Sequence, residues 1–274
     1  MRSPGGPRRG HQGSGGHPQK RRPSPQREVL FGIHPVREML LAGRRTCHAL
    51  WLARGQDHPR VADLRSMAEA RGLGLQVASA EMLAKRCGDD RHQGVAAEVS
   101  PFVFTDMETV LPPAVEVRQG AFLLALDSIV DPQNLGAILR TALCAGIEAV
   151  ILPKDRSVRP TPLVSKASAG ALEHTRLIQV TNLANTLADL KTSGFWVAGT
   201  DAGSGKSLFA SDLTGPLVVV IGSEGKGMRP LVRRRCDFLL AIPQAGAIGS
   251  LNASAAAAVV LYEAFRQRRL NDGG

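Results

Sequence analysis

Residues 122–140 read Phe-Leu-Leu-Ala-Leu-Asp-Ser-Ile-Val-Asp-Pro-Gln-Asn-Leu-Gly-Ala-Ile-Leu-Arg, and this stretch indicates the fold. The continuous apolar run at 122–126 is typical of a strand that is covered on both faces. Apolar residues then recur at helical spacing over residues 134–145, and Gly146 ends that pattern. A buried strand followed by an amphipathic helix is the repeating unit of an α/β fold.

The alternation of strand and helix continues towards the end of the chain. Apolar runs predict further strands at residues 149–152, 177–180, 195–198, 217–221 and 238–242. Helical spacing predicts helices at residues 163–172, 183–190, 231–236 and 250–268. Residues 120–274 are therefore expected to form one α/β domain with a mostly parallel sheet covered on both faces.

The part of the chain before this domain divides into three. Residues 1–28 are rich in Gly, Pro, Ser and Arg, cannot bury enough apolar surface to offset ordering, and are expected to be a disordered basic tail. Residues 29–99 alternate short apolar strands with helical patterns and predict a small α/β domain. Residues 100–119 contain three prolines and scattered acids, which is typical of a linker.

The positive charge of the chain is concentrated at its beginning. The formal net charge is +10, which favours a polyanionic partner. Residues 1–27 hold seven Lys or Arg and no acid, so the rest carries 27 basic and 24 acidic side chains, a net charge of +3. This arm is either a solubilising tail or an RNA-binding arm that releases counterions. Its many Gly and Pro residues argue against the amphipathic helix of a mitochondrial transit peptide.

Several patterns together predict a cytoplasmic protein. No apolar stretch is long enough for a membrane span, and the N-terminus lacks the apolar segment of a signal peptide. The four cysteines have neither metal-ligand nor Cys-x-x-Cys spacing, which indicates buried thiols in a reducing compartment. We therefore expect no membrane partner and no metal.

The segment 200–207, Thr-Asp-Ala-Gly-Ser-Gly-Lys-Ser, looks like a phosphate-binding P-loop but departs from it. The pattern needs a glycine where Thr200 stands, and the residues after Ser207 are too few and too broken for the required helix. The sequence also lacks a G-x-G-x-x-G turn between a first strand and helix, which argues against dinucleotide binding and against the common Rossmann-type methyltransferases. A surface loop after a strand is the expected structure here.

The first candidate site segment is residues 131–140, at the start of the helix that follows the first buried strand. Asn134 is expected at the N-cap, where its side chain would bond to free amide groups. Arg140 lies just off the apolar stripe of the same helix. Most arginines on a helix face are simply solvated, so this position alone gives Arg140 no role.

The second segment, residues 222–227, follows a buried strand. Its glycines allow a ligand to approach the backbone closely. It also carries Glu224, whose alternative role is to cap a helix beginning near Met228.

The third segment begins at Ile242, at the end of the last strand. A loop of small residues leads from there to Ser250, a natural N-cap. Asn252 would lie in the first helical turn, where free amides and the positive end of the helix dipole favour a polar ligand.

These segments, in this order and spacing, resemble the motifs of the SpoU/TrmH branch of the SPOUT RNA methyltransferases. The first is Asp-Pro-Gln-Asn-Leu-Gly with Arg140, the second is Gly-x-Glu-Gly-x-Gly, and the third is Ser-Leu-Asn-Ala-Ser at 250–254. Residues 31–36 and 92–95 resemble signatures of the substrate-binding domain in front of many such enzymes, although a structural turn role is favoured for His34 and His92. The resemblance implies a C-terminal trefoil knot, S-adenosylmethionine as methyl donor, no metal, and a homodimer with its site near the subunit interface.

The same resemblance implies methylation of a ribose 2'-hydroxyl, that of a guanosine in 23S rRNA. Arg140 is implied to activate the hydroxyl; because a guanidinium does not lose its proton, we expect it to act as a cation that favours the alkoxide. The resemblance implies that substrate is positioned by Asn134, Glu224, Ser250 and Asn252. It implies that the donor is held near Thr200, Gly222, Ile242 and Leu251.

Two other functions stay open. One is a tRNA or resistance-type rRNA 2'-O-methyltransferase of the same family. The other is a non-catalytic RNA-binding ribosome-assembly factor, which would have no need of the complete set of polar motif residues.

Overall fold

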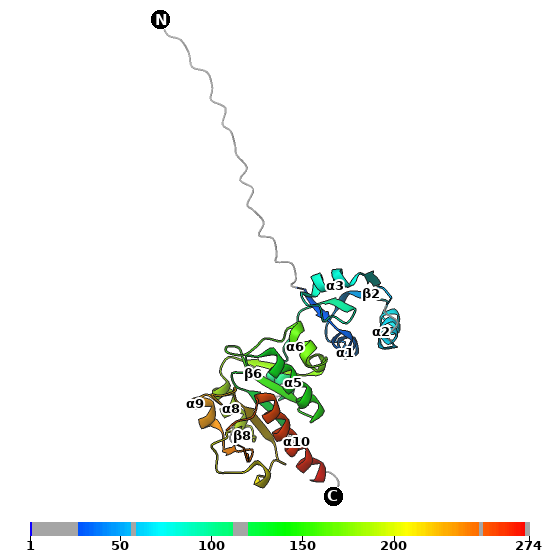
Figure 1. Ribbon diagram of the computed structural model, residues 1–274. Coiled ribbons are helices and arrows are strands. Elements are labelled where there is room, and N and C mark those ends of the chain that lie inside the picture. Colours follow the sequence, from blue (N-terminus) through cyan, green and yellow to red (C-terminus); the bar gives the residue numbers. More distant parts are fainter. Residues whose placement is uncertain (2–26, 56–58, 112–119, 247–248, 272–274) are drawn as a thin grey trace.

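The computed structural model describes residue 1 and residues 27–55, 59–111, 120–246 and 249–271. These residues form two α/β units (Figure 1), a smaller one at the N-terminal side and a larger one that follows it. The smaller unit lies against the larger one beside α6. Residues 2–26, and with them nearly all of the expected basic tail, lie outside the described residues.

The smaller unit is built on a mixed sheet of four strands in the order β1-β4-β2-β3. Only β2 and β3 run parallel; β4 pairs antiparallel with both β1 and β2. The strands are β1 (Glu28–Phe31), β2 (Cys47–Ala53), β3 (Leu75–Ala78) and β4 (Val95–Val99). The helices are α1 (Ile33–Ala42), α2 (Pro59–Ala70) and α3 (Ala80–Cys87).

The larger unit contains a six-stranded sheet in the order β10-β8-β9-β5-β6-β7, and all neighbouring strands are parallel. This confirms the predicted parallel sheet. The strands are β5 (Phe122–Leu126), β6 (Ala149–Pro153), β7 (Leu177–Val180), β8 (Trp196–Thr200), β9 (Leu217–Ile221) and β10 (Phe238–Leu240). The helices are α5 (Pro132–Cys144), α6 (Pro162–Ala167), α7 (Ala171–His174), α8 (Leu183–Thr192), α9 (Pro230–Arg235) and α10 (Ala253–Asn271), with a 3-10 turn η1 at Leu208–Ala210.

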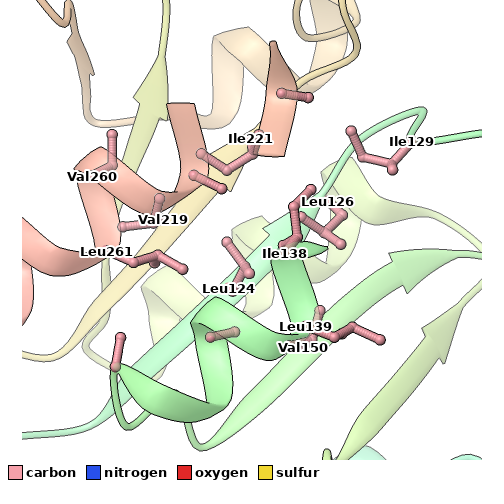
Figure 2. Packing of buried hydrophobic residues seen from close by; sticks show 14 of the residues in the cluster. Leu124, Leu126, Ile129, Ile138, Leu139, Val150, Val219, Ile221, Val260 and Leu261 are labelled. Atoms are coloured by element: carbon pink, nitrogen blue, oxygen red, sulfur yellow. The ribbon is translucent and has the colours of Figure 1, made fainter. Parts of the chain in front are cut away.

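Strand β5 lies in the middle of this sheet and contributes to two apolar cores. Because successive side chains of a strand point to opposite faces, Leu124 and Leu126 pack against α5 and α10, as Figure 2 shows. Leu123 and Ala125 face the other way, into a second core that α8 and α9 cover. All five residues of β5 are buried, as expected for a strand covered on both faces.

One predicted helix is wrong. The helix expected over residues 163–172 is two short helices, α6 and α7, separated by a turn in which Ala169 and Gly170 have φ angles of 51° and 88°. The left-handed conformation suits glycine at the second position. A Cβ on Gly170 would also lie 2.6 Å from Cβ of Glu38 in the smaller unit, so contact between the units fixes this turn.

The segment expected to be a linker is partly packed against the larger unit. Phe102 and Phe104 lie against its first core, and the amide of Thr105 donates to the carbonyl of Leu177 at 2.8 Å. A short helix, α4 (Met107–Val110), follows, and residues 112–119 lie outside the described residues. In the described ranges, none of the helices combines the length and apolar character needed to cross a membrane.

A buried ion network joins the two units. Arg45 of the smaller unit is 7% exposed, and its guanidinium lies 3.4 Å from the carboxylate of Glu173 on α7, which is 2% exposed. Arg45 also donates to Glu28 at the start of β1, and Ser165 on α6 donates to Glu173 at 2.8 Å. Burial raises the pKa of Glu173, and Arg45 and Ser165 counteract this effect. Such a pair requires both partners, because either charge alone would be buried without compensation.

The two signature segments of the smaller unit also meet the larger unit. Lys166 on α6 donates to the carbonyl of Arg91, and its ammonium lies 5.0 Å from the ring centre of Phe31. Within the smaller unit, Nδ1 of His92 accepts from the amide of Gly94 at 3.0 Å, which is the structural turn role favoured for this histidine.

Candidate active site

The three motif segments meet at the carboxyl ends of β5, β9 and β10, where parallel sheets commonly bind ligands. Oε1 of Glu224 accepts a hydrogen bond from Nδ2 of Asn134 at 2.8 Å and another from Nδ2 of Asn252. The amide of Ala253, at the start of α10, donates to the same oxygen at 3.3 Å. Nδ2 of Asn252 also donates to Oδ1 of Asn134 at 3.0 Å. Each of the three side chains comes from a different predicted segment, and we call this group the polar node.

The turn that carries Glu224 depends on its glycines. Gly225 and Gly227 have φ angles of 72° and 63°, a conformation that residues with a side chain rarely adopt. Gly222 has a different constraint: a Cβ there would lie 2.3 Å from the carbonyl carbon of Gly227 and 2.4 Å from the amide of Met228. The turn therefore folds back against Gly222 itself.

A cavity of about 470 Å³ lies beside the polar node, a size typical of sites for small organic ligands. All four residues predicted to hold the methyl donor line it, and so do Glu224 and Ser250. Further lining residues include Asp201, Ala202, Lys226, Met228, Arg233, Leu240 and Gln244. The hydroxyl of Thr200 donates to the carbonyl of Val220 at 3.2 Å, which fixes the end of β8 against β9.

The expected helix caps are wrong at two positions. Asp131, and not Asn134, caps α5, because its carboxylate accepts from the amides of Gln133 and Asn134. Asn252, and not Ser250, caps α10: its Oδ1 accepts from the amide of Ser254 at 2.9 Å. These caps leave Nδ2 of both asparagines available for the polar node.

Glu224 does not take its alternative role, which was to cap the helix near Met228. The residue at the N-cap of α9 is Arg229, without a side-chain cap bond. The carboxylate of Glu224 points to the polar node and to the first amide of α10 instead.

Arg140 is the one predicted site residue that does not join this arrangement within the chain. It is exposed, does not line the cavity, and its side chain has no hydrogen bond or ion pair with the described residues. It follows Asn134 by six residues on α5, which places it about 9 Å further along the helix and on another face.

Two acidic residues at the same edge of the sheet have roles that the motif analysis missed. Asp127, directly after β5, is fully buried and accepts at 2.7 Å from both the amide and Nε of Arg229, where the glycine turn ends. Asp201, directly after β8, accepts from Nε of Arg233 at 2.7 Å, and this bond lowers the pKa of Asp201. An acid immediately after an apolar strand was the signal that could have identified both.

The described part of the chain has neither the structure of a phosphate-binding P-loop at residues 200–207 nor a cluster of side chains that could hold a metal ion. The loop after Thr200 leads only into the three-residue turn η1, not into a helix that could hold phosphates. Among the described residues, no group of three or more His, Cys, Asp or Glu side chains could hold a metal ion.

Comparison with known families covers both units. The family described as "SpoU rRNA Methylase family" matches residues 121–262, and "RNA 2'-O ribose methyltransferase substrate binding" matches residues 29–104. The chain belongs to the SpoU rRNA methylase family. This confirms the family that the three motifs resemble.

Individual relatives agree with this membership. A Pseudomonas putida protein, 23S rRNA (guanosine-2'-O-)-methyltransferase RlmB, is 44% identical over 247 residues, which are 89% of this chain and 98% of the relative. A crystal structure of an RNA 2'-O ribose methyltransferase is 27% identical, covers 92% of each chain and has a TM-score of 0.75. The SpoU methyltransferase AviRb of Streptomyces viridochromogenes, solved with AdoMet, is 24% identical, covers 89% of this chain and 91% of its own, and has a TM-score of 0.73.

Proposed function

We propose that this protein transfers a methyl group from S-adenosylmethionine to the ribose 2'-oxygen of a guanosine in 23S rRNA. Its family makes it an RNA ribose 2'-O-methyltransferase. The guanosine and the 23S rRNA come from the relatives that are more than 40% identical over nine-tenths of the chain.

The observation that carries this proposal is the polar node beside the cavity. Residues 134, 224 and 252 are far apart in the sequence, yet their side chains form one hydrogen-bonded group next to a space of about 470 Å³. A group of fixed donors and acceptors next to a ligand cavity can hold a ribose hydroxyl at a bound methyl donor, which is the main requirement of a transfer reaction.

The cavity has properties that suit S-adenosylmethionine. Its wall combines apolar side chains, such as Leu240 and Met228, with the exposed backbone of the turn at residues 222–227 and the carboxylates of Asp201 and Glu224. Lys226 and Arg233 also line the cavity, so its wall carries charges of both signs, which suits a donor that has an ammonium, a sulfonium and a carboxylate group. When bound, S-adenosylmethionine supplies an electrophilic methyl group on sulfur.

The polar node orients the substrate. Because Glu224 already accepts from two asparagine amides and one backbone amide through Oε1, its other oxygen is the acceptor that remains for a ribose hydroxyl. Ser250, at the rim of the cavity, supplies a hydroxyl that can donate to or accept from the sugar. The transfer needs no metal.

Arg140 has its proposed role in a homodimer. A cation near the attacking oxygen would favour the alkoxide, but within one chain Arg140 lies away from the polar node. We propose that a second copy of the chain brings its Arg140 to the node. If so, mixing Arg140→Ala with Glu224→Ala chains restores part of the activity, because one of the two sites in a mixed dimer keeps both residues.

The direct test is methyl transfer from labelled S-adenosylmethionine to 23S rRNA, with the modified ribose mapped by primer extension. The proposal expects one methylated guanosine and at least a hundredfold loss of kcat in Glu224→Gln, with Asp189→Asn on the exposed face of α8 as the control. No transfer to rRNA by the wild-type chain contradicts the proposal. Binding of RNA without binding of S-adenosylmethionine, measured by calorimetry, would favour the assembly-factor alternative.

The remaining expectations are part of the same proposal. They are a cytoplasmic location, an RNA-binding role for the basic tail, a division at residues 29–99 and 120–274, and a trefoil knot near the C-terminus. Removing residues 1–27 tests the tail: the salt dependence of RNA binding decreases if the tail contacts phosphates and stays the same if it does not.

A further inference from the structure

We infer that the loop after β6 binds backbone phosphates of the RNA next to the nucleotide that is methylated. This inference rests on the proposed function and adds a contact surface to it. The loop comprises residues 154–159, Lys-Asp-Arg-Ser-Val-Arg, and we call it the cationic loop.

The three cations of this loop are available to a ligand. Lys154, Arg156 and Arg159 are all exposed, and none of their side chains has a hydrogen bond or ion pair with the described residues. Asp155 is the only acid in the loop, so the loop carries a net charge of +2. By contrast, Arg229, which also follows the carboxyl end of a strand, forms an ion pair with Asp127.

The backbone of the cationic loop is held in place at both ends. The amide of Lys154 donates to the carbonyl of Val180 at 2.8 Å, and the amide of Val158 donates to the carbonyl of Ile129 at 2.9 Å. Between these bonds Arg156 has a φ angle of 59°, which costs a bulky residue about 1 kcal/mol or more. A strained arginine whose side chain has no partner among the described residues points to a ligand for that side chain.

The position of the loop suits RNA that enters the polar node. Strand β6 pairs with β5, and β5 pairs with β9, so the loop after β6 lies about 10 Å, or two strand spacings, from the turn that carries Glu224. A stacked nucleic acid strand rises about 3.4 Å per nucleotide, so this distance corresponds to roughly three nucleotides. The bond from Val158 to Ile129 also joins the loop to the segment that leads into α5 and Asn134.

The chain also connects the loop to the smaller unit. The chain continues from it into α6, which contacts β1 of that unit. A strand of RNA that touches both the predicted substrate-binding domain and the polar node can therefore also contact the cationic loop. Lysine and arginine side chains are the usual partners of phosphate groups, which fix the register of an RNA without reading its sequence.

The test is a triple variant, Lys154→Gln, Arg156→Asn and Arg159→Gln, in the full chain. Asparagine is chosen at position 156 because it tolerates a positive φ angle. Binding to deproteinised 23S rRNA is measured between 50 and 200 mM salt. Each lost phosphate contact lowers the salt slope by about 0.7, so three contacts lower it by about 2, and the loss of affinity over this fourfold range becomes about twentyfold smaller than in wild type.

Controls separate this inference from the proposed function. Affinity for S-adenosylmethionine and the melting temperature are expected to match wild type, and Arg176→Ala, an exposed cation before β7 at the opposite edge of the sheet, is expected to keep the wild-type slope. An unchanged slope in the triple variant, while the wild-type chain methylates rRNA, overturns the role of the loop alone. If the wild-type chain transfers no methyl group to rRNA, it is the proposed function that fails.

Discussion

Replacing Gly222 by alanine tests whether the glycine turn forms one wall of the donor site. The new Cβ would lie 2.3 Å from the carbonyl carbon of Gly227 and 2.4 Å from the amide nitrogen of Met228. Both are backbone atoms, so no side-chain rotation relieves the overlap. Because β9 pairs with β5 on one side and β8 on the other, the strand stays in place and the turn moves.

The size of the effect follows from this overlap. Contacts of a Cβ with other atoms normally lie at 3.4 Å or more, so the backbone at Gly227 has to move by roughly 1 Å. Overpacking of this kind costs about 1–3 kcal/mol of stability, or about 2–4 °C of melting temperature per kcal/mol for a domain of this size. If the displaced turn loses two hydrogen bonds to the donor, at about 1 kcal/mol each, the Kd rises about thirtyfold.

Calorimetric titration with S-adenosylmethionine and thermal unfolding measure the two effects on the same sample. Gly215→Ala is the matched control, because a Cβ there meets nothing within 4 Å. The melting temperature and the Kd of this control are expected to match wild type. A Gly222→Ala protein that is destabilised but binds S-adenosylmethionine with wild-type affinity would refute the assignment of this turn to the donor site.

Three further predictions follow from buried groups. Asp127→Asn removes the buried carboxylate that accepts from the amide and Nε of Arg229 and should reduce the free energy of unfolding by about 1–3 kcal/mol, measured in urea; an unchanged free energy of unfolding contradicts this. Burial raises the pKa of Cys236 to about 12, so at pH 8 iodoacetamide should alkylate exposed Cys144 first and Cys236 only near that pKa or after unfolding, as peptide mass spectrometry would show. Arg45→Met should destabilise the protein more at pH 8 than at pH 5. The pKa of Glu173 is raised by burial, so at low pH this acid takes up a proton and no longer needs the guanidinium; equal losses of stability at both pH values would count against the pair.

The sequence was sufficient for the larger sheet because its strands are continuous apolar runs. Continuous apolar runs of this length are typical of strands that are buried on both faces, and Phe122–Leu126 is buried throughout. The break between α6 and α7 could not be predicted in this way. It depends on Gly170 packing against Glu38, which is more than a hundred residues away in the sequence.

The site residues also divide into features that local sequence predicts and features that depend on distant contacts. Asn134 and Asn252, both chosen from the motifs, are hydrogen-bonded to each other, but capping preferences predicted the wrong helix caps, since Asp131 caps α5. Local preference cannot show which of two neighbouring polar residues caps a helix and which faces a distant partner. Arg140 remains a prediction, because a single chain does not bring it to the polar node.

The buried pair of Arg45 and Glu173 limits how this protein can be recombined. A chimera that joins the catalytic half of this chain to the front half of a relative neutralises Glu173 only if that front half supplies a guanidinium at the position of Arg45. Joining the halves near residue 100 without that arginine leaves a buried carboxylate uncompensated and destabilises the hybrid. The separation of the apolar cores is therefore not enough to choose an exchange point in this protein, because the ion pair crosses it.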